Sequence, residues 1–218
     1  MARAMQGLSL GRMLGVPIIV NWTALLILAF LILQRDTSSP SAMAGAALYG
    51  LAVLGSILVH EMGHAAAGKR LGLAPQGIVI HGFGGLCAYG RAPRGKEGVL
   101  SSAAGPAAGL ALAAVLGGVT FAVGGVLPAP IHRLFQEIVW FNLFWSVFNL
   151  LPMWPLDGGH VLWHGLRLKV SAPRAWKITR AVGITMAVIV ALAGWAIGWT
   201  FAIIIAAMSV MDLLQRDR

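Results

Sequence analysis

The chain has 218 residues, of which 58% are hydrophobic and only 11% are charged. Soluble domains average about 25% charged residues, so this composition excludes an ordinary soluble protein and indicates an integral membrane protein. The net charge is +9, but the basic residues lie in short segments between apolar runs, where they orient membrane helices, so we expect no nucleic acid partner. The single cysteine, Cys87, excludes an intramolecular disulfide and a cysteine-based metal site.

The first half of the chain is predicted to hold two membrane helices and two β regions. Residues 6–15 are short, punctuated by glycine and roughly alternating, which is compatible with a strand. Apolar runs predict helices over about 16–33 and 42–71, separated by a polar turn. Residues 76–90 combine a β-branched run with five glycines, which predicts short strands joined by a tight turn.

The second half of the chain is predicted to be helical and to contain one break at membrane depth. The predicted helices cover about 98–126, 131–151, 176–194 and 198–214. Pro152 and Pro155 break the chain after the fourth helix, and irregular backbone at that depth is tolerated only inside protein or beside a wet cavity. We therefore expect a single all-α polytopic membrane domain over residues 1–218, with about six transmembrane helices and a small membrane-associated β-sheet.

The distribution of lysine and arginine predicts the orientation in the membrane. With a cytosolic N-terminus, fourteen of these sixteen residues fall on the cytosolic side, and only Arg35 and Arg133 fall outside. This bias agrees with the positive-inside rule and predicts a multi-pass protein, with both termini in the cytosol, in what we expect to be a prokaryotic cell membrane. The first apolar run lacks a small-residue cleavage site, so we expect it to stay as an anchor.

A pair of histidines and a glutamate lie inside the second apolar run. On a helix, His60 and His64 are four residues apart, so their side chains share one face and can bind the same ion. Glu61 is adjacent to the first histidine and is placed to act on a water molecule as a general base. Ionisable groups in hydrocarbon cost about 2.5–3.5 kcal/mol each and usually mark function. The segment therefore predicts a zinc site within the membrane.

The third ligand of this zinc site follows by elimination. A catalytic zinc ion typically has three protein ligands and one open position. Apart from Glu61 the chain has six acidic residues, and five of them lie in a loop, a basic connector, the tail or the opposite leaflet: Asp36, Glu97, Glu137, Asp212 and Asp217. Asp157 remains, after the double-proline break, so the predicted site is one Zn²⁺ ion held by His60, His64 and Asp157.

Three motifs in this order give the chain its resemblance to a known family. They are His-Glu-Met-Gly-His at 60–64, Ala-Gly-Pro at 104–106 and Asn-Leu-Leu-Pro-Met-Trp-Pro-Leu-Asp-Gly-Gly at 149–159. Together with Gly-Phe-Gly-Gly at 82–85 and the segment 11–17, they resemble the site-2 protease family of intramembrane zinc metalloproteases, peptidase family M50. The resemblance covers nearly the whole chain, in a minimal form without room for PDZ or CBS domains.

The resemblance implies an activity and further site residues. Its chemistry would be the hydrolysis of peptide bonds in a single-span membrane protein, such as a transcription factor or an anti-sigma factor. Asn149 would lie near the metal and assist catalysis. Independently of the resemblance, Gly82, Phe83, Gly84 and Gly85 are expected to form part of an exposed edge strand that pairs with the extended substrate. A separate regulatory membrane protein is a further expected partner, besides the lipid bilayer.

Two other classes of protein could carry these residues. A polytopic metal-ion transporter would also bind a metal through histidine and aspartate, but it would need ligands spread along a path. A catalytically inactive scaffold is disfavoured because every chemical group is present. Outside the predicted ligands, His81 and His160 are expected to support the site or lie at an interface. Small residues Gly105 and Gly109 predict close helix packing, with 65–68 as the expected partner.

Overall fold

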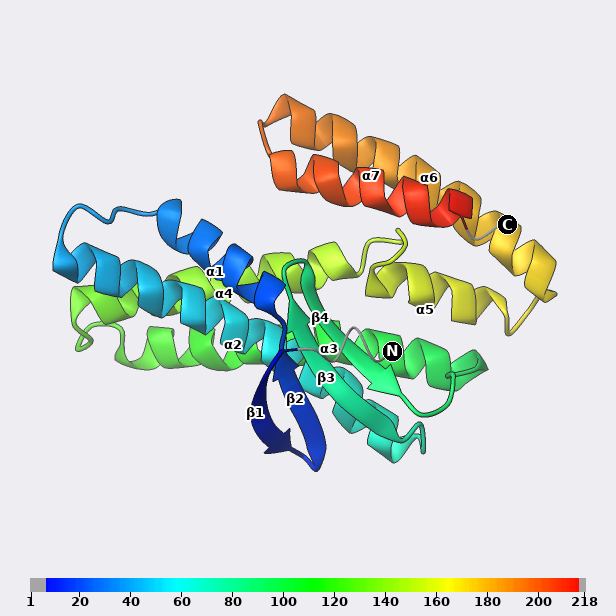
Figure 1. Cartoon of the computed structure of the whole chain (residues 1–218), viewed down its shortest axis with the longest axis horizontal. Helices are drawn as coiled ribbons and strands as arrows, with labels where there is room; N and C mark the ends of the chain where they lie inside the picture. Colours follow the sequence, from blue (N-terminus) through cyan, green and yellow to red (C-terminus); the bar gives the residue numbers. More distant parts are fainter. Residues whose placement is uncertain (1–6, 216–218) are drawn as a thin grey trace. The chain divides into compact units, whose positions relative to one another are not determined.

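The computed structural model describes residues 7–215, so the predictions for Arg3, for residue 6 of the first β region and for 216–218 lie outside the described residues. Its elements comprise a four-stranded sheet and seven helices within this range (Figure 1). The strands are β1 (Leu8–Met13), β2 (Val16–Val20), β3 (Pro75–His81) and β4 (Gly84–Tyr89). The helices are α1 (Trp22–Leu33), α2 (Pro40–Arg70), α3 (Gly95–Val123), α4 (Ala129–Asn149), α5 (Asp157–Leu166), α6 (Ala172–Ala196) and α7 (Thr200–Gln215).

Three of the described helices are long and apolar enough to cross a membrane: α2, α3 and α6. Helices α1 and α7 are apolar but shorter, with 12 and 16 residues. The prediction of a mostly helical integral membrane protein with a small sheet is confirmed at this coarser level, and the prediction of six spans is not confirmed. The described residues divide into two compact units, one formed by 7–92 and 104–146 and the other by 93–103 and 147–215. The expectation of one protease domain over 1–218 stays a prediction.

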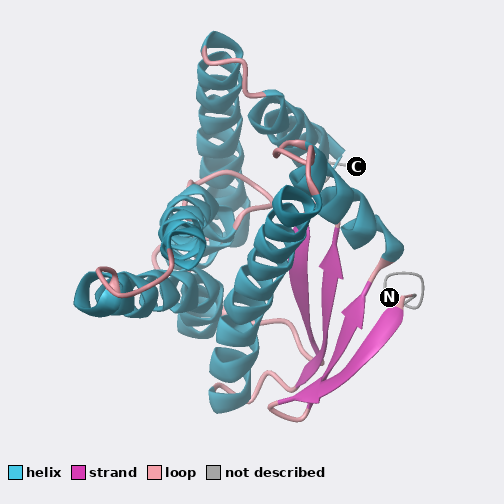
Figure 2. Cartoon of the chain, turned by 90° about the vertical axis from the view of Figure 1, so that its left-hand side faces the viewer, coloured by secondary structure: helices cyan, strands magenta, loops and turns pink. Residues whose placement is uncertain are grey.

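The sheet belongs to the first unit and has the order β1-β2-β3-β4 (Figure 2). Strands β1 and β2 are antiparallel, β2 and β3 are parallel, and β3 and β4 are antiparallel. Helices α1 and α2 form the connection between the two parallel strands, which cannot be joined by a tight turn. Strand β4 therefore lies at one edge of the sheet as it is described.

The predicted helix over 16–33 is wrong in its first part. Residues 16–20 form β2, and its neighbour Asn21 caps α1 by accepting a hydrogen bond from the Thr23 backbone N–H at 3.0 Å. Val16 and Ile18 are buried in the core of the first unit, together with residues of α2 and β3. A short apolar run of this kind is a buried strand or part of a buried helix, and periodicity alone does not distinguish the two.

Helix α2 carries the two histidines and has defined ends. Ser39 caps its N-terminus by accepting from the Ala42 N–H at 3.2 Å, and Pro40 occupies the first turn. At the other end, Arg91 donates to the carbonyls of Leu71 and Gly72 at 2.9 and 3.0 Å. These contacts define both ends of α2 and therefore the positions of its side chains along the helix axis.

Buried polar contacts join α2 to α4 one turn before His60. Asn142 is 2% exposed and donates to the Ser56 hydroxyl and to the Ile138 carbonyl, each at 2.9 Å. In an apolar surrounding, a buried amide of this kind needs such partners. The contact therefore fixes the position of α4 along the axis of α2 within the first unit.

The second unit contains α5, which the sequence did not predict, and the hairpin of α6 and α7. The two helices of the hairpin run side by side (Figure 1) and share a core with Phe148 and Met153. Helix α5 begins at Asp157, inside the segment predicted to be an irregular break. The break itself is confirmed, because residues 150–156 separate α4 from α5.

Candidate metal centre

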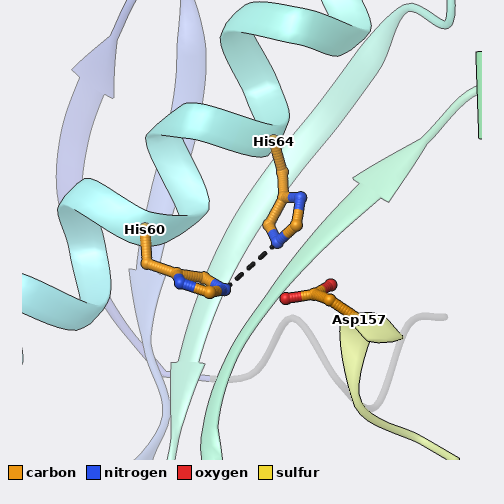
Figure 3. Close-up of side chains that lie close together, drawn as sticks. All are labelled: His60, His64 and Asp157. Carbon is orange, nitrogen blue, oxygen red and sulfur yellow. Dashed lines mark hydrogen bonds between the residues drawn. The ribbon is translucent and has the colours of Figure 1, made fainter. Parts of the chain in front are cut away.

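His60 and His64 lie on one face of α2, as their spacing predicts. Both are buried, with 3% and 7% of their surface exposed. Their rings meet edge to face with centroids 4.9 Å apart, and their Nε2 atoms are 3.2 Å apart (Figure 3). Two imidazole nitrogens bound to tetrahedral zinc at 2.0–2.1 Å would be roughly 3.3 Å apart. The two histidines therefore already hold their nitrogens at the separation that a shared zinc ion requires.

Asp157 completes a group that could hold one metal ion. One ligand atom from each of His60, His64 and Asp157 lies within 4.8 Å of the others, and Figure 3 shows the three side chains directed toward one another. Among the described residues, this is the one group of three or more potential metal ligands whose atoms lie so close together. Two imidazoles and one carboxylate form the donor set of a catalytic zinc site, so the residues present fit the predicted metal.

The space beside the two imidazoles depends on a glycine of α3. A Cβ atom at Gly105 would overlap the Nε2 atom of His64 and would lie 2.7 Å from the Nε2 atom of His60. Gly63 of α2 lies equally close to α3, because its Cβ would overlap the Ala104 carbonyl. The predicted close packing of small residues is confirmed for these two helices at Gly105, with Gly63 on α2, whereas Gly109 packs against Ser146 of α4. Gly68, in the segment expected to face α3, packs against Tyr89 instead.

Strand β4 contacts both the turn of α2 that carries His64 and the side chain of Glu61. The Tyr89 hydroxyl donates to the His64 carbonyl at 3.0 Å. Glu61 is 4% exposed, and a Cβ atom at Gly85 would overlap its side chain, so this carboxylate lies directly against β4. In the same strand, burial raises the pKa of the Cys87 thiol to about 12, and the nearby Glu61 acts in the same direction. Cys87 is therefore a neutral thiol at neutral pH, as expected for a residue that is not a metal ligand.

The other predicted site residues have clear places in the fold. Gly82 and Phe83 form the turn between β3 and β4, while Gly84 and Gly85 begin β4. Gly84 has a φ of 128°, a conformation that favours glycine, at the point where the chain enters the edge strand. Asn149 is the last residue of α4 and is buried. The sequence prediction did not assign roles in the site to Gly105 and Tyr89, although Gly105 lies in the Ala-Gly-Pro motif.

Comparison with known proteins gives the family. The profile of peptidase family M50 matches residues 119–192. Rip3 of Mycobacterium tuberculosis, which is provisionally named a zinc metalloprotease, is 33% identical over 208 residues. The alignment covers 87% of this chain and 53% of Rip3. The chain belongs to peptidase family M50. The resemblance drawn from the motifs is thus confirmed.

Two matches from Methanocaldococcus jannaschii, one to a sequence and one to a solved structure, extend the comparison. The zinc metalloprotease MJ0392 is 28% identical over 185 residues, which are 84% of this chain and 52% of that protein. The solved structure of the site-2 protease from this organism matches with a TM-score of 0.68 at 23% identity and covers 97% of this chain and 95% of the solved one. This structural likeness shows a shared fold. The chain spans about half the length of the curated relatives it matches.

The family and the donor set agree on the cofactor. The relatives are named zinc metalloproteases, and His60, His64 and Asp157 form a group that could hold one metal ion. Zinc, which the sequence predicted, is therefore a metal that fits the donor set of this member of peptidase family M50.

Proposed function

We propose that this protein is an intramembrane zinc endopeptidase that hydrolyses peptide bonds of membrane-anchored proteins. The observation that carries the proposal is the group formed by the buried His60 and His64 with the partly buried Asp157, with the carboxylate of Glu61 beside it on α2. Zinc held by the three ligands would activate a water molecule and polarise the scissile carbonyl. A hydrolase needs these parts together with a base, and α2 supplies the base one residue after its first ligand.

Glu61 acts in this proposal as the general base. Its carboxylate accepts a proton from the attacking water as the oxygen bonds to the carbonyl carbon, and it delivers that proton to the leaving amine as the C–N bond breaks. Asn149 is proposed to bind the substrate carbonyl or the negative charge that develops on its oxygen. Both assignments come from the family resemblance and from the burial of the two residues.

The position of β4 supports a way to hold the substrate. A transmembrane helix hides its peptide groups in hydrogen bonds, so the bond to be cut must first become extended. Strand β4 lies at the edge of the described sheet, and Phe83 and Leu86 expose about half of their surface there. We propose that an unwound segment of the substrate pairs with β4, because an exposed strand edge offers backbone donors and acceptors.

Pairing with β4 predicts that cleavage depends on every second backbone N–H group of the substrate. In a synthetic single-span peptide that the protein cleaves, N-methylation removes one backbone donor at a time. In a paired strand, the N–H groups of alternate residues point toward the neighbouring strand. A single methyl group on one of these N–H groups near the cleavage site should therefore abolish cleavage. Methylation at the positions between should reduce it only slightly. Cleavage rates measured across such a series would show no alternation if β4 does not pair with the substrate.

The proposed topology places the site near the cytosol. The three apolar helices support a multi-pass membrane protein, and the positive-inside bias of the sequence supports cytosolic termini. His60 lies ten residues before Arg70 at the end of α2, or roughly 15 Å along a helix. We therefore propose that cleavage releases a product toward the cytosol, and that a transcription factor or an anti-sigma factor is a suitable substrate.

Metal removal tests the activity directly. Purified protein in detergent should lose cleavage of a single-span substrate after dialysis against a zinc chelator, and it should regain cleavage when one equivalent of zinc is restored. Magnesium, which prefers octahedral oxygen ligands, should not restore cleavage and serves as the control. Zinc uptake into vesicles by a protein that cleaves nothing would support the alternative of a metal-ion transporter.

Gly85 provides a test of Glu61 that leaves the ligands unchanged. The Gly85→Ala variant should keep its zinc but lose most of its cleavage, because the new methyl group would displace the Glu61 carboxylate. We expect a loss of about 100-fold, the lower end of what a general base contributes. Gly55→Ala is the matched control on α2, since no atom lies within 4 Å of the added Cβ. Normal cleavage by Gly85→Ala at wild-type zinc content would contradict the role of Glu61.

A further inference from the structure

The first turn of α5 is held by unusually close backbone contacts. A Cβ atom at Gly158 would overlap the carbonyl oxygens of Leu150 and Leu151. A Cβ atom at Gly159 would lie 2.9 Å from the Met153 carbonyl, closer than real Cβ contacts. The two glycines after Asp157 therefore let the start of α5 pack directly on the backbone that precedes it. This packing places the backbone of Asp157 but leaves the direction of its side chain to be set by other contacts.

His160 holds the peptide group that leads into Asp157. The Leu156 carbonyl accepts the backbone N–H of Gly159 at 3.1 Å and that of His160 at 3.4 Å. The Nδ1 atom of His160 lies 3.1 Å from the same oxygen. Since a carbonyl oxygen only accepts, Nδ1 carries a hydrogen and donates it. One oxygen thus binds three donors, and the plane of the peptide between Leu156 and Asp157 is fixed.

The imidazole of His160 is itself held by aromatic side chains. Its centroid lies 4.0 Å from that of Trp154, with the two rings tilted by 36°. Trp154 is 6% exposed and packs edge to face on Trp176 of α6, which in turn packs edge to face on Trp163 of α5. Aromatic pairs at such separations are favourable beyond the area that they bury. His160 therefore has an aromatic support in addition to its contact with the Leu156 carbonyl.

We propose that His160 is a positioning residue that, supported by Trp154, holds Asp157 in the orientation in which its carboxylate ligates zinc. The inference rests on the proposed function, in which Asp157 is a ligand. Residues that orient metal ligands through hydrogen bonds typically contribute 10- to 100-fold to metal affinity. Here the hydrogen bond acts on the backbone of the ligand, one residue before it, and the aromatic ring keeps the donor in place.

Zinc affinity, measured by competition with a chromogenic chelator, tests this role in the whole 218-residue chain. His160→Phe keeps an aromatic ring beside Trp154 but removes the donor, so we expect zinc binding to weaken by about 10- to 100-fold. His160→Asn loses the ring but keeps an N–H group near the position of Nδ1, so its affinity should lie closer to that of the wild type. Gly165→Ala is the matched control on α5, because nothing lies within 4 Å of its added Cβ.

The melting temperature of the zinc-free protein separates positioning from general stability. The positioning role predicts that His160→Phe melts like the wild type without zinc and gains less stability when zinc is added. Wild-type zinc affinity in His160→Phe would overturn the inference. So would a loss of affinity in His160→Phe that accompanies an equal loss of stability in the zinc-free protein, because packing alone would then explain it.

Asp157→Asn distinguishes this inference from the proposed function. If Asp157→Asn binds zinc as tightly as the wild type, Asp157 is not a ligand, and both the proposed site and the role of His160 are wrong. If Asp157→Asn loses zinc and His160→Phe does not, the proposed site stands and only the role of His160 is wrong. Loss of zinc by both variants, with the control unchanged, is the result that the inference predicts.

Discussion

Glu61→Gln should retain its zinc and cleave a single-span substrate about 10²- to 10⁴-fold more slowly than the wild type. The range is what a positioned general base contributes to a reaction. Glutamine has nearly the shape of glutamate, so the buried space between α2 and β4 should stay filled. Its amide cannot take a proton from the attacking water at neutral pH. Atomic absorption would measure the zinc content, which should not change, and initial rates in detergent would measure cleavage, which should slow.

Glu137→Gln is the matched control for Glu61→Gln. It makes the same chemical change at a glutamate that forms an ion pair with Arg35, away from the proposed site. We expect it to cleave within about twofold of the wild type, since partly exposed ion pairs contribute little. A Glu61→Gln protein that cleaves as fast as Glu137→Gln would refute the assignment of the base. One that also loses zinc would make Glu61 a ligand.

Gly105→Ala should weaken zinc binding by at least roughly 100-fold and abolish cleavage at limiting zinc. The added methyl group would occupy the space of the His64 imidazole and would press on that of His60, so the two Nε2 atoms could not keep their separation. The loss of zinc affinity should be at least as large as the loss caused by removing a residue that orients a metal ligand through a hydrogen bond. Competition with a chelator would measure the affinity, and excess zinc should recover part of the activity.

Gly118→Ala makes the same substitution in the same helix where no atom lies within 4 Å of the added Cβ. It should bind zinc and cleave as the wild type does. If Gly105→Ala and Gly118→Ala bind zinc equally well, the contact of α3 with the two imidazoles does not shape the site.

The sequence predicted the metal group because its chemistry is local. The spacing of His60 and His64 places their side chains on the same face of any helix. After the other acidic residues were eliminated, only Asp157 could be the third ligand. The neighbours of these side chains were harder to predict. Gly105 and Gly85 carry no functional group, and their contacts with the histidines and with Glu61 depend on how α3 and β4 pack on α2. A single sequence shows that such glycines exist but not what each of them faces.

The two errors in secondary structure have separate physical causes. Residues 16–20 continue directly into an apolar helix, and their burial in the sheet hides the alternation that marks most strands. The segment after Asp157 contains three glycines, which lower helix propensity, yet α5 forms there. Close packing of Gly158 and Gly159 on neighbouring backbone overrides that propensity, because only residues without a side chain fit. Both outcomes depend on tertiary contacts.

The most direct test of the central claim is a crystal structure of the zinc-loaded protein with anomalous scattering measured at the zinc edge. We predict one anomalous peak per chain, bonded to Nε2 of His60, Nε2 of His64 and a carboxylate oxygen of Asp157, at about 2.0–2.2 Å. Glu61 should lie beside the metal without bonding to it. A peak elsewhere in the chain, or one without Asp157 among its ligands, would contradict the proposed site.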